Sequence, residues 1–311
     1  MMAFLVRRVG WALLTLWLVV SGTFALAYLL PSDPARMVAG PHASEEVVER
    51  IRVELKLDQP LPVQYAHYVG GVARLDLGRS YRTKEPVLDA IKRSLPWTAL
   101  LAVGAACFQV LVGVPIGLFA ALRRRSLADV GAMMVALLGI SAPTFLTGLG
   151  LMVIVGFYAG LLPLGGVAPG SFGVLKSAIL PSLTLGIAGA AYYSRLTRGE
   201  YLDVAQRDFM RTARAKGQTE GVVTLKHGLR NALLPVVTFL GLDLGTLLGG
   251  AVVTETIFAW PGMGKLAIDS VLNQDIPVLL GTVLVSSTFI VTANLVVDVV
   301  YARLDPRIRL G

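Results

Sequence analysis

The chain has 311 residues, of which 55% are hydrophobic and only 15% are charged, and its mean hydropathy is +0.68. A soluble domain of this length has no core large enough to bury so many apolar side chains, so the chain belongs in a lipid bilayer. The formal net charge of +8 does not indicate a nucleic acid partner, because the basic residues gather beside the apolar runs, where they set membrane orientation.

Six apolar runs are long enough to cross a membrane, since crossing roughly 30 Å of hydrocarbon takes about 20 helical residues. These runs cover residues 9–30, 97–122, 129–160, 177–197, 232–258 and 277–301. They predict an all-α, polytopic membrane protein in which residues 1–311 form a single transmembrane domain with six transmembrane helices. The first run is too long for the apolar core of a signal peptide, so we expect it to be retained.

The segment 31–96, between the first two runs, is the only sizeable hydrophilic part of the chain. Ser44 is a candidate cap for a short helix whose apolar stripe would consist of Val47, Val48, Ile51 and Leu55. Further helical pieces are predicted over residues 60–74 and 85–95. The segment is too small and too charged to form its own core. It is therefore predicted to be external, either as a lid on the outer ends of the spans or as a seat for an external binding protein, and these two interpretations are compatible.

Prolines within the apolar runs can kink or break the helices that contain them. They are Pro115, Pro143, Pro181 and Pro235. Bent spans of this kind can form gates, but prolines are frequent in membrane helices. We therefore draw no functional conclusion from them alone.

A basic stretch, residues 198–233, separates the fourth run from the fifth. Lys216 and Gly217 predict a helix end, because a cation suits the last turn and glycine can adopt the left-handed conformation that closes it. The hydroxyl of Thr219 can cap a second helix, whose apolar stripe would consist of Val222, Leu225, Leu229 and Leu233. Two short helices joined at a glycine form a shape that a partner can grip, so we interpret this stretch as a cytosolic docking element.

The last two runs contain small and polar residues at membrane depth. The fifth run has a glycine at every fourth position, at Gly241, Gly245 and Gly249. Such a strip lets another helix come close, and it forms either a packing seam or a wall of a pore. Polar side chains in a membrane usually face protein or water, and those in or near the last two runs are Asp243, Glu255, Asn294 and Asp298. For Asp243 and Asp298, a hydrogen bond near a helix end and contact with a peptide amino group in the path both remain open.

The distribution of basic residues predicts the orientation of the chain. Arginines or lysines precede the first run, follow the second and sixth runs and fill the stretch 198–233, as in Arg7, Arg8, Arg123, Arg124, Arg125, Arg303, Arg307 and Arg309. The loop 161–175 contains none. By the positive-inside rule both termini and the stretch 198–233 are expected in the cytosol.

Residues 211–217, with the sequence RTARAKG, resemble the E-A-A-x-x-x-G coupling motif in the membrane subunits of ATP-binding-cassette (ABC) importers. The extension HGLRNALLP at 227–235 is similar to the dipeptide, oligopeptide and nickel branch of these importers. Arg211 stands where the motif has Glu, and Thr212 stands where it has the first Ala. Other segments resemble the same branch in the same order, namely LPSDPA at 30–35, DLGRS at 76–80, AWPGMG at 259–264 and LDPRIR at 304–309.

This resemblance implies the first of the two permease subunits of an importer for peptides or peptide-like solutes, in the inner membrane of a bacterium. Its partners would be a second homologous permease, two cytosolic ATPases that hold ATP and Mg²⁺, and an external substrate-binding protein. The residues that couple to an ATPase would be Arg211, Thr212, Ala213, Ala215, Lys216, Gly217, His227 and Arg230. A further group would lie at the external face, namely Glu255, Trp260, Pro261, Gly262 and Gly264.

The sequence contains no recognisable motif for catalysis or for binding a metal or a nucleotide. His42, His67 and His227 have no ligand spacing, and the sequence has no phosphate loop of the form G-x-x-x-x-G-K-[ST] and no hydrolase motif. The chain is therefore predicted to be a non-catalytic subunit without a cofactor or metal, and another subunit must supply the energy. An ion-driven secondary transporter and an intramembrane enzyme are weaker alternatives, because the charges cluster in the loops and no catalytic pair lies in the apolar runs.

The substrate is left open among related solutes. Within the branch that this chain resembles, similar permeases carry dipeptides, oligopeptides, glutathione and nickel chelates. The short loop 161–176 is slightly closer to that of the glutathione-type permeases.

Overall fold

The computed structural model describes residues 2–29, 33–40 and 42–304. Regular structure in these ranges is helical, with one isolated bridge between Arg79 and Pro86. In chain order the helices, with π-helical segments marked η, are α1 (Met2–Leu29), α2 (Pro34–Ala39), α3 (Glu45–Glu54), α4 (Leu61–Ala73), α5 (Val87–Phe108), η1 (Gln109–Gly113), α6 (Val114–Leu122), α7 (Leu127–Ser141), α8 (Thr144–Leu151), η2 (Met152–Tyr158), α9 (Ser171–Ala205), α10 (Asp208–Ala215), α11 (Glu220–Val222), η3 (Val223–Leu229), α12 (Arg230–Leu248), α13 (Val252–Ile257), α14 (Met263–Leu272) and α15 (Ile276–Leu304).

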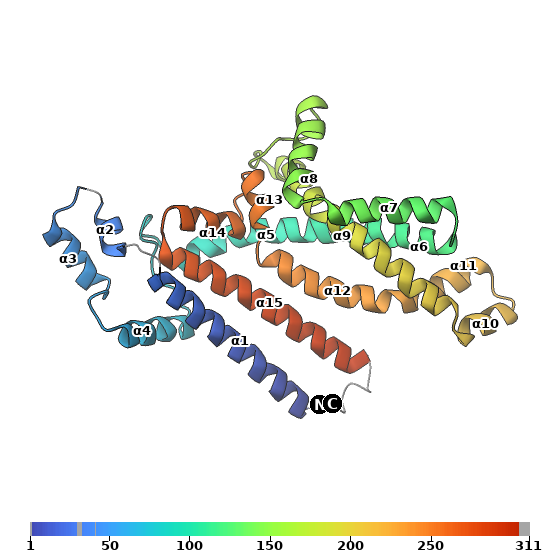
Figure 1. The fold of residues 1–311 in the computed structure, drawn as a ribbon, viewed down its shortest axis with the longest axis horizontal. Coiled ribbons are helices and arrows are strands. Elements are labelled where there is room, and N and C mark those ends of the chain that lie inside the picture. The colour runs from blue at the N-terminus through green and yellow to red at the C-terminus, as the bar shows by residue number, and fades with distance from the viewer. Residues whose placement is uncertain (1, 30–32, 41, 305–311) are drawn as a thin grey trace.

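Helix α9 is the centre of the bundle, since it packs against α5, η1, α6, α7 and α12. Helix α15 packs on α12 and, on another side, on α1 (Figure 1). Helices α2, α3 and α4 lie at one end of the bundle, whereas α10 and α11 lie at the opposite end (Figure 1). The helices α2–α4 of the hydrophilic segment and the helices α10 and α11 of the basic stretch are therefore on opposite sides of the apolar helices.

The prediction of an all-α, polytopic membrane protein is confirmed. Five continuous helical stretches are long and apolar enough to cross a membrane, namely Val6–Ala25, Val87–Leu122, Ser171–Ala205, Glu220–Leu248 and Ile276–Val299. A sixth is obtained when α7 and the α8–η2 pair, which are bent by 103° relative to each other, are counted as one broken span.

The predicted third span, 129–160, is thus not straight. It breaks at Pro143, whose ring disfavours the helical conformation of the preceding residue, and Ala142 accordingly has an extended backbone with ψ of 125°. Pro96, Pro181 and Pro235 lie inside continuous helices. A proline in an apolar run therefore does not by itself end a helix in this protein.

The predicted fifth span, 232–258, is also divided. Helix α12 ends at Leu248, and the chain turns through Gly250, whose φ of 112° lies in the region that favours glycine. The remainder of the run forms the short helix α13. The span is therefore shorter than the apolar run, because the chain turns out of the α12 direction before the run is finished.

The segment 31–96 agrees with its predicted helices only in part. The helix after Ser44 and the helix at 60–74 are present as α3 and α4, although the Ser44 side chain makes no capping hydrogen bond. Within α3, Val48 is buried, whereas Val47 is exposed. The predicted piece at 85–95 is not separate, because it forms the first turns of α5. Residues 30–32 of the LPSDPA segment and 305–309 of the LDPRIR segment lie outside the described residues.

Candidate functional site

The turn between α10 and α11 has the conformation that the sequence predicted. Gly217 follows the end of α10 with a left-handed φ of 74°. Across the turn, Arg214 Nε donates to Glu220 Oε1 at 2.9 Å. Thr219 precedes α11 in an extended conformation, but its hydroxyl does not cap the helix as predicted. The ion pair holds the two short helices together at the surface of the protein.

Helix α10 has one buried face and one exposed face. Met210 and Ala213 are buried in a cluster that joins α9, α10, η3 and α12 and includes Tyr201 and Val223. The other predicted coupling residues of this turn are exposed, namely Arg211, Thr212, Ala215, Lys216 and Gly217. His227 bonds to Gln218 at 2.7 Å, and Arg230 is exposed. A force on the exposed face of α10 would therefore reach α9 and α12 through packed side chains.

The apolar stripe predicted after Gly217 is wrong in its first half. Val222 and Leu225 are 41% and 58% exposed, whereas Val223 is fully buried. The reason is the π-helix η3, whose wider turn shifts the inward face relative to an α-helix. A side chain on Gly228 would lie 2.7 Å from the Tyr201 ring, so this glycine lets η3 approach α9. The other two members of the stripe are partly buried, namely Leu229 and Leu233.

Glu255 forms a buried junction at the middle of α5. Its Oε1 accepts a hydrogen bond of 2.8 Å from the Thr98 hydroxyl, and its Oε2 accepts one of 3.0 Å from the backbone N–H of Lys265. The Thr98 hydroxyl oxygen accepts a bond of 2.8 Å from the N–H of Met263. These bonds tie α5, α13 and α14 together, and we call this group the Glu255 junction.

The residues predicted at the external face are mostly interior residues of this junction. Trp260 is fully buried and donates from Nε1 to the carbonyl of Trp97 at 3.0 Å. A side chain on Gly262 would collide with the Glu255 carboxylate, and one on Gly264 would lie 2.7 Å from Val252 Cα. Pro261 alone of the five predicted residues is exposed. Gly262 and Gly264 are buried because the chain packs closely against the Glu255 carboxylate and Val252 at these two positions.

The glycine strip of α12 faces α15. A side chain on Gly241 would lie 2.7 Å from Val297 Cγ2, one on Gly245 would collide with Ala293, and one on Gly249 would lie 3.4 Å from Ile290 Cδ1. The hydroxyl of Ser286 on α15 also donates to the Gly249 carbonyl at 2.5 Å. In this geometry the strip forms a close contact between two helices.

The three polar residues of the last two spans have different surroundings. Asp298 forms an ion pair of 3.0 Å with Arg8 of α1. Asn294 is exposed on α15. Asp243 lies beside the Gln109 amide and within electrostatic range of Tyr193. The structure therefore does not bring these three residues into one site.

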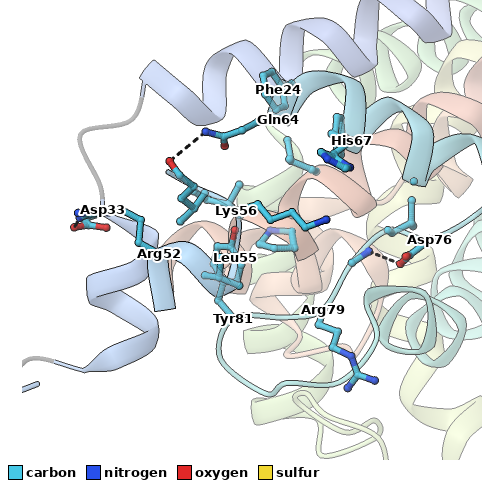
Figure 2. A pocket seen from close by; sticks show the side chains of 18 residues that line it. Phe24, Asp33, Arg52, Leu55, Lys56, Gln64, His67, Asp76, Arg79 and Tyr81 are labelled. Atoms are coloured by element: carbon cyan, nitrogen blue, oxygen red, sulfur yellow. Dashed lines mark hydrogen bonds and ion pairs between the residues drawn. The ribbon is translucent and has the colours of Figure 1, made fainter. Parts of the chain in front are cut away.

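A cavity of about 570 Å³ lies among α1, α4, the turn before α4, the 76–81 loop and the start of α15. Lys56 reaches into it, and His67 stands on the α4 side (Figure 2). At its rim Arg52 and Asp33 form an ion pair of 2.6 Å, which raises the pKa of the Arg52 guanidinium. Burial raises the pKa of the Tyr68 phenol in the cavity wall. The cavity thus combines apolar walls with charged groups of both signs at the end of the bundle that carries α2–α4.

Comparison with known proteins decides the family. A family model described as "Binding-protein-dependent transport system inner membrane component" matches residues 113–310, and the model of the corresponding N-terminal region matches residues 1–102. The chain belongs to this family. It is a multi-pass, inner-membrane permease of an ABC importer of the peptide and nickel type.

Relatives of this permease match it over nearly their whole length. It is 42% identical over 309 residues to the glutathione transport system permease protein GsiC of Escherichia coli (strain K12). It is 44% identical over 310 residues to the GsiC of Salmonella choleraesuis, and in both cases 99% of each chain is covered. A solved structure of the MetNI methionine ABC transporter, in an inward-facing conformation, has a TM-score of 0.59 at 17% identity and covers 71% of this chain and 99% of that chain. This last likeness shows the fold alone.

Several residues that organise the permease were not identified from its sequence. Thr98, Gln109 and Tyr193 are each polar residues within an apolar run, and this was the available signal. The sequence does not say which of them meet Glu255 or Asp243, because the partners are 157 residues apart for Thr98 and Glu255 and lie in different helices for the others. Their contacts follow from helix packing alone.

Proposed function

We propose that this permease forms one half of the translocation path of an ATP-driven importer for peptides or peptide-like solutes. Glutathione is the first solute to test, because the relatives above are named as glutathione permeases. Nickel chelates are the alternative within the same branch. ATP and Mg²⁺ would be held by two cytosolic ATPase subunits, and the second half of the path would be a homologous permease.

The observation that carries this proposal is the exposed turn around Gly217 at the opposite end of the bundle from α2–α4. One ATPase would contact the exposed face of α10, and its nucleotide-driven closure would push on that helix. The buried contacts of Met210 with Tyr201 and Val223 would transmit the push to α9 and η3. Access would then switch between the two sides as a two-state shift, biased by the different affinities of the two states for ATP.

The opposite end of the bundle would receive the binding protein. Helices α2–α4 with the cavity beside Lys56 present both apolar and charged groups there. The Glu255 junction would hold the outer ends of α5 and α14 in one arrangement beneath them. Both termini of the permease would lie in the cytosol, on the same side as the Gly217 turn.

The test begins with the binding protein encoded beside this permease and measures its affinity for glutathione, a dipeptide and a nickel chelate. The permease is then reconstituted in liposomes with its partner permease and ATPases, and uptake of the bound solute is measured. We expect uptake of glutathione or a dipeptide that requires both ATP and the binding protein. Uptake of a nickel chelate alone would show that the substrate is a nickel chelate and not a peptide-like solute. Uptake that needs an ion gradient but no ATP would overturn the mechanism.

A further inference from the structure

Three buried oxygen atoms without a hydrogen-bond partner belong to side chains of the apolar helices that neighbour one another. Among the described residues, Gln109 Oε1, Tyr193 Oη and Asp243 Oδ2 are all shielded from solvent and unpaired. Gln109 is 2% exposed and Tyr193 is 0% exposed. Gln109 belongs to η1, Tyr193 to α9 and Asp243 to α12, and the Asp243 carboxylate lies beside the Gln109 amide and within electrostatic range of Tyr193. Because a buried polar atom without a partner loses its hydrogen bonds to water and gains none in return, three such atoms on neighbouring side chains require an explanation.

The backbone around these atoms is built to bring them close. Gln109 begins the π-helix η1, and such segments often occur at functional sites. A side chain on Gly189 of α9 would collide with the Gln109 amide, and one on Gly113 of η1 would lie 2.8 Å from Tyr193 Cβ. Two glycines on facing helices therefore allow α9 and η1 to pack with these polar groups between them.

Aromatic rings complete the surroundings of Asp243. Phe239 lies one turn before it on α12 and packs against the Tyr193 ring at 5.6 Å between centroids. Tyr192 stacks on Phe239 at 4.3 Å and is 40% exposed. The group therefore has one edge at the surface of α9, where a solute or the partner permease can reach it. Aromatic faces next to a carboxylate are a favourable environment for a small organic cation.

We propose that Gln109, Tyr193 and Asp243 form a binding site for the primary ammonium group of the transported solute. An ammonium group has three N–H donors, which matches the three unpaired oxygens. Its positive charge compensates the carboxylate in a region where an uncompensated charge is costly. Tyr192 and Phe239 would flank the carbon atoms next to the nitrogen. This inference rests on the proposed function, because a peptide-like solute with a free amino group is the cation that would pass α9 and α12.

The site is tested first without transport, on the detergent-purified complex of the two permeases and the ATPases. Thermal unfolding is measured in ethylammonium chloride and in sodium chloride at equal ionic strength. We expect ethylammonium to raise the melting temperature by several degrees relative to sodium, because a ligand that binds only the folded state stabilises it. Equal melting temperatures in the two salts would overturn the proposal, because the site would then not distinguish an organic ammonium ion from an inorganic cation.

Variants separate the site from a general effect on folding. Asp243→Asn keeps the shape of the side chain but removes its charge, and we expect it to abolish the response to ethylammonium. Tyr193→Phe removes only an unpaired hydroxyl, so we expect the unliganded protein to be at least as stable as the wild type while the response is reduced. The matched control is Thr197→Val, which removes a buried, unpaired hydroxyl one turn further along α9. A control that loses the response as fully as Tyr193→Phe would contradict the assignment.

Uptake then distinguishes this inference from the proposed function. In liposomes with the binding protein, we expect Asp243→Asn to lower the glutathione taken up per ATP hydrolysed by about tenfold, the effect of losing one charged hydrogen bond. Ligand-stimulated ATP hydrolysis should persist, because the Gly217 turn is distant from the site. Unchanged uptake per ATP would overturn the site. If the wild type takes up no glutathione, the proposed substrate is wrong, and the thermal experiment alone decides the ammonium site.

Discussion

At the scale of single residues, Gly217 is the position where the backbone constrains the side chain most clearly. Its φ of 74° costs a β-branched residue on the order of 1 to 2 kcal/mol, although an added Cβ would meet no atom within 4 Å. We expect Gly217→Val to distort the turn while the spans remain inserted. Transport and ligand-stimulated ATP hydrolysis by the reconstituted complex should both fall.

The control for this variant is Gly221→Ala. Gly221 lies in the same segment, has an ordinary helical backbone, and has open space around an added Cβ. Gly221→Ala should leave ligand-stimulated ATP hydrolysis unchanged. If Gly217→Val is present in the membrane and also shows normal ligand-stimulated ATP hydrolysis, the turn has no coupling role.

Glu255 is a second residue whose chemistry predicts a measurable loss. Both carboxylate oxygens accept hydrogen bonds in a fully buried position. In Glu255→Gln one oxygen is replaced by an amide nitrogen, which cannot accept from the Thr98 hydroxyl or from the N–H of Lys265. We expect a loss of about 1 to 3 kcal/mol in the free energy of unfolding, measured as a lower melting temperature. Glu54→Gln, at an exposed position of α3, is the control, and an equal effect of both variants would contradict this account.

At the scale of helices, the contact between α12 and α15 decides how the glycine strip is used. Gly245→Leu would place a side chain against Ala293, and overpacking of this kind costs about 1 to 3 kcal/mol. We expect a lower melting temperature of the purified complex. Gly131→Leu is the control, because Gly131 is exposed on α7 and an added Cβ there meets no atom within 4 Å.

The same variant tests the alternative that the strip lines the path. An unchanged melting temperature together with lost uptake would reject the packing seam. A variant that is normal in both measurements would show that the strip faces neither a helix nor the solute.

At the scale of the whole molecule, the separation of α2–α4 from α10 and α11 predicts the outcome of a topology experiment. Reporter fusions after Arg125, Gly217 and Gly311 should report the cytosol, because basic residues mark that side. Fusions near Glu54 and Gly170 should report the outside. A cytosolic signal at Glu54 would contradict the six-span arrangement.

The sequence alone determined the membrane class, the all-α fold, the approximate positions of the apolar helices and the left-handed turn at Gly217. These properties are local, because hydropathy, helix length and the φ preference of glycine are set by residues near one another in the chain. The family resemblance also rested on short segments in a fixed order. For this reason the local properties and the family resemblance could be predicted without knowledge of any contact between helices.

The tertiary structure alone decided which residues meet. The bend at Pro143 could not be told from the sequence, because three other prolines lie in unbroken helices. The inward face of η3 depends on its π-helical turn, and the burial of Glu255 depends on a donor from Thr98, which is 157 residues away in the chain. Likewise, the meeting of Gln109, Tyr193 and Asp243 results from the packing of three helices, since hydropathy sets the depth of each polar side chain but not the neighbour that it faces.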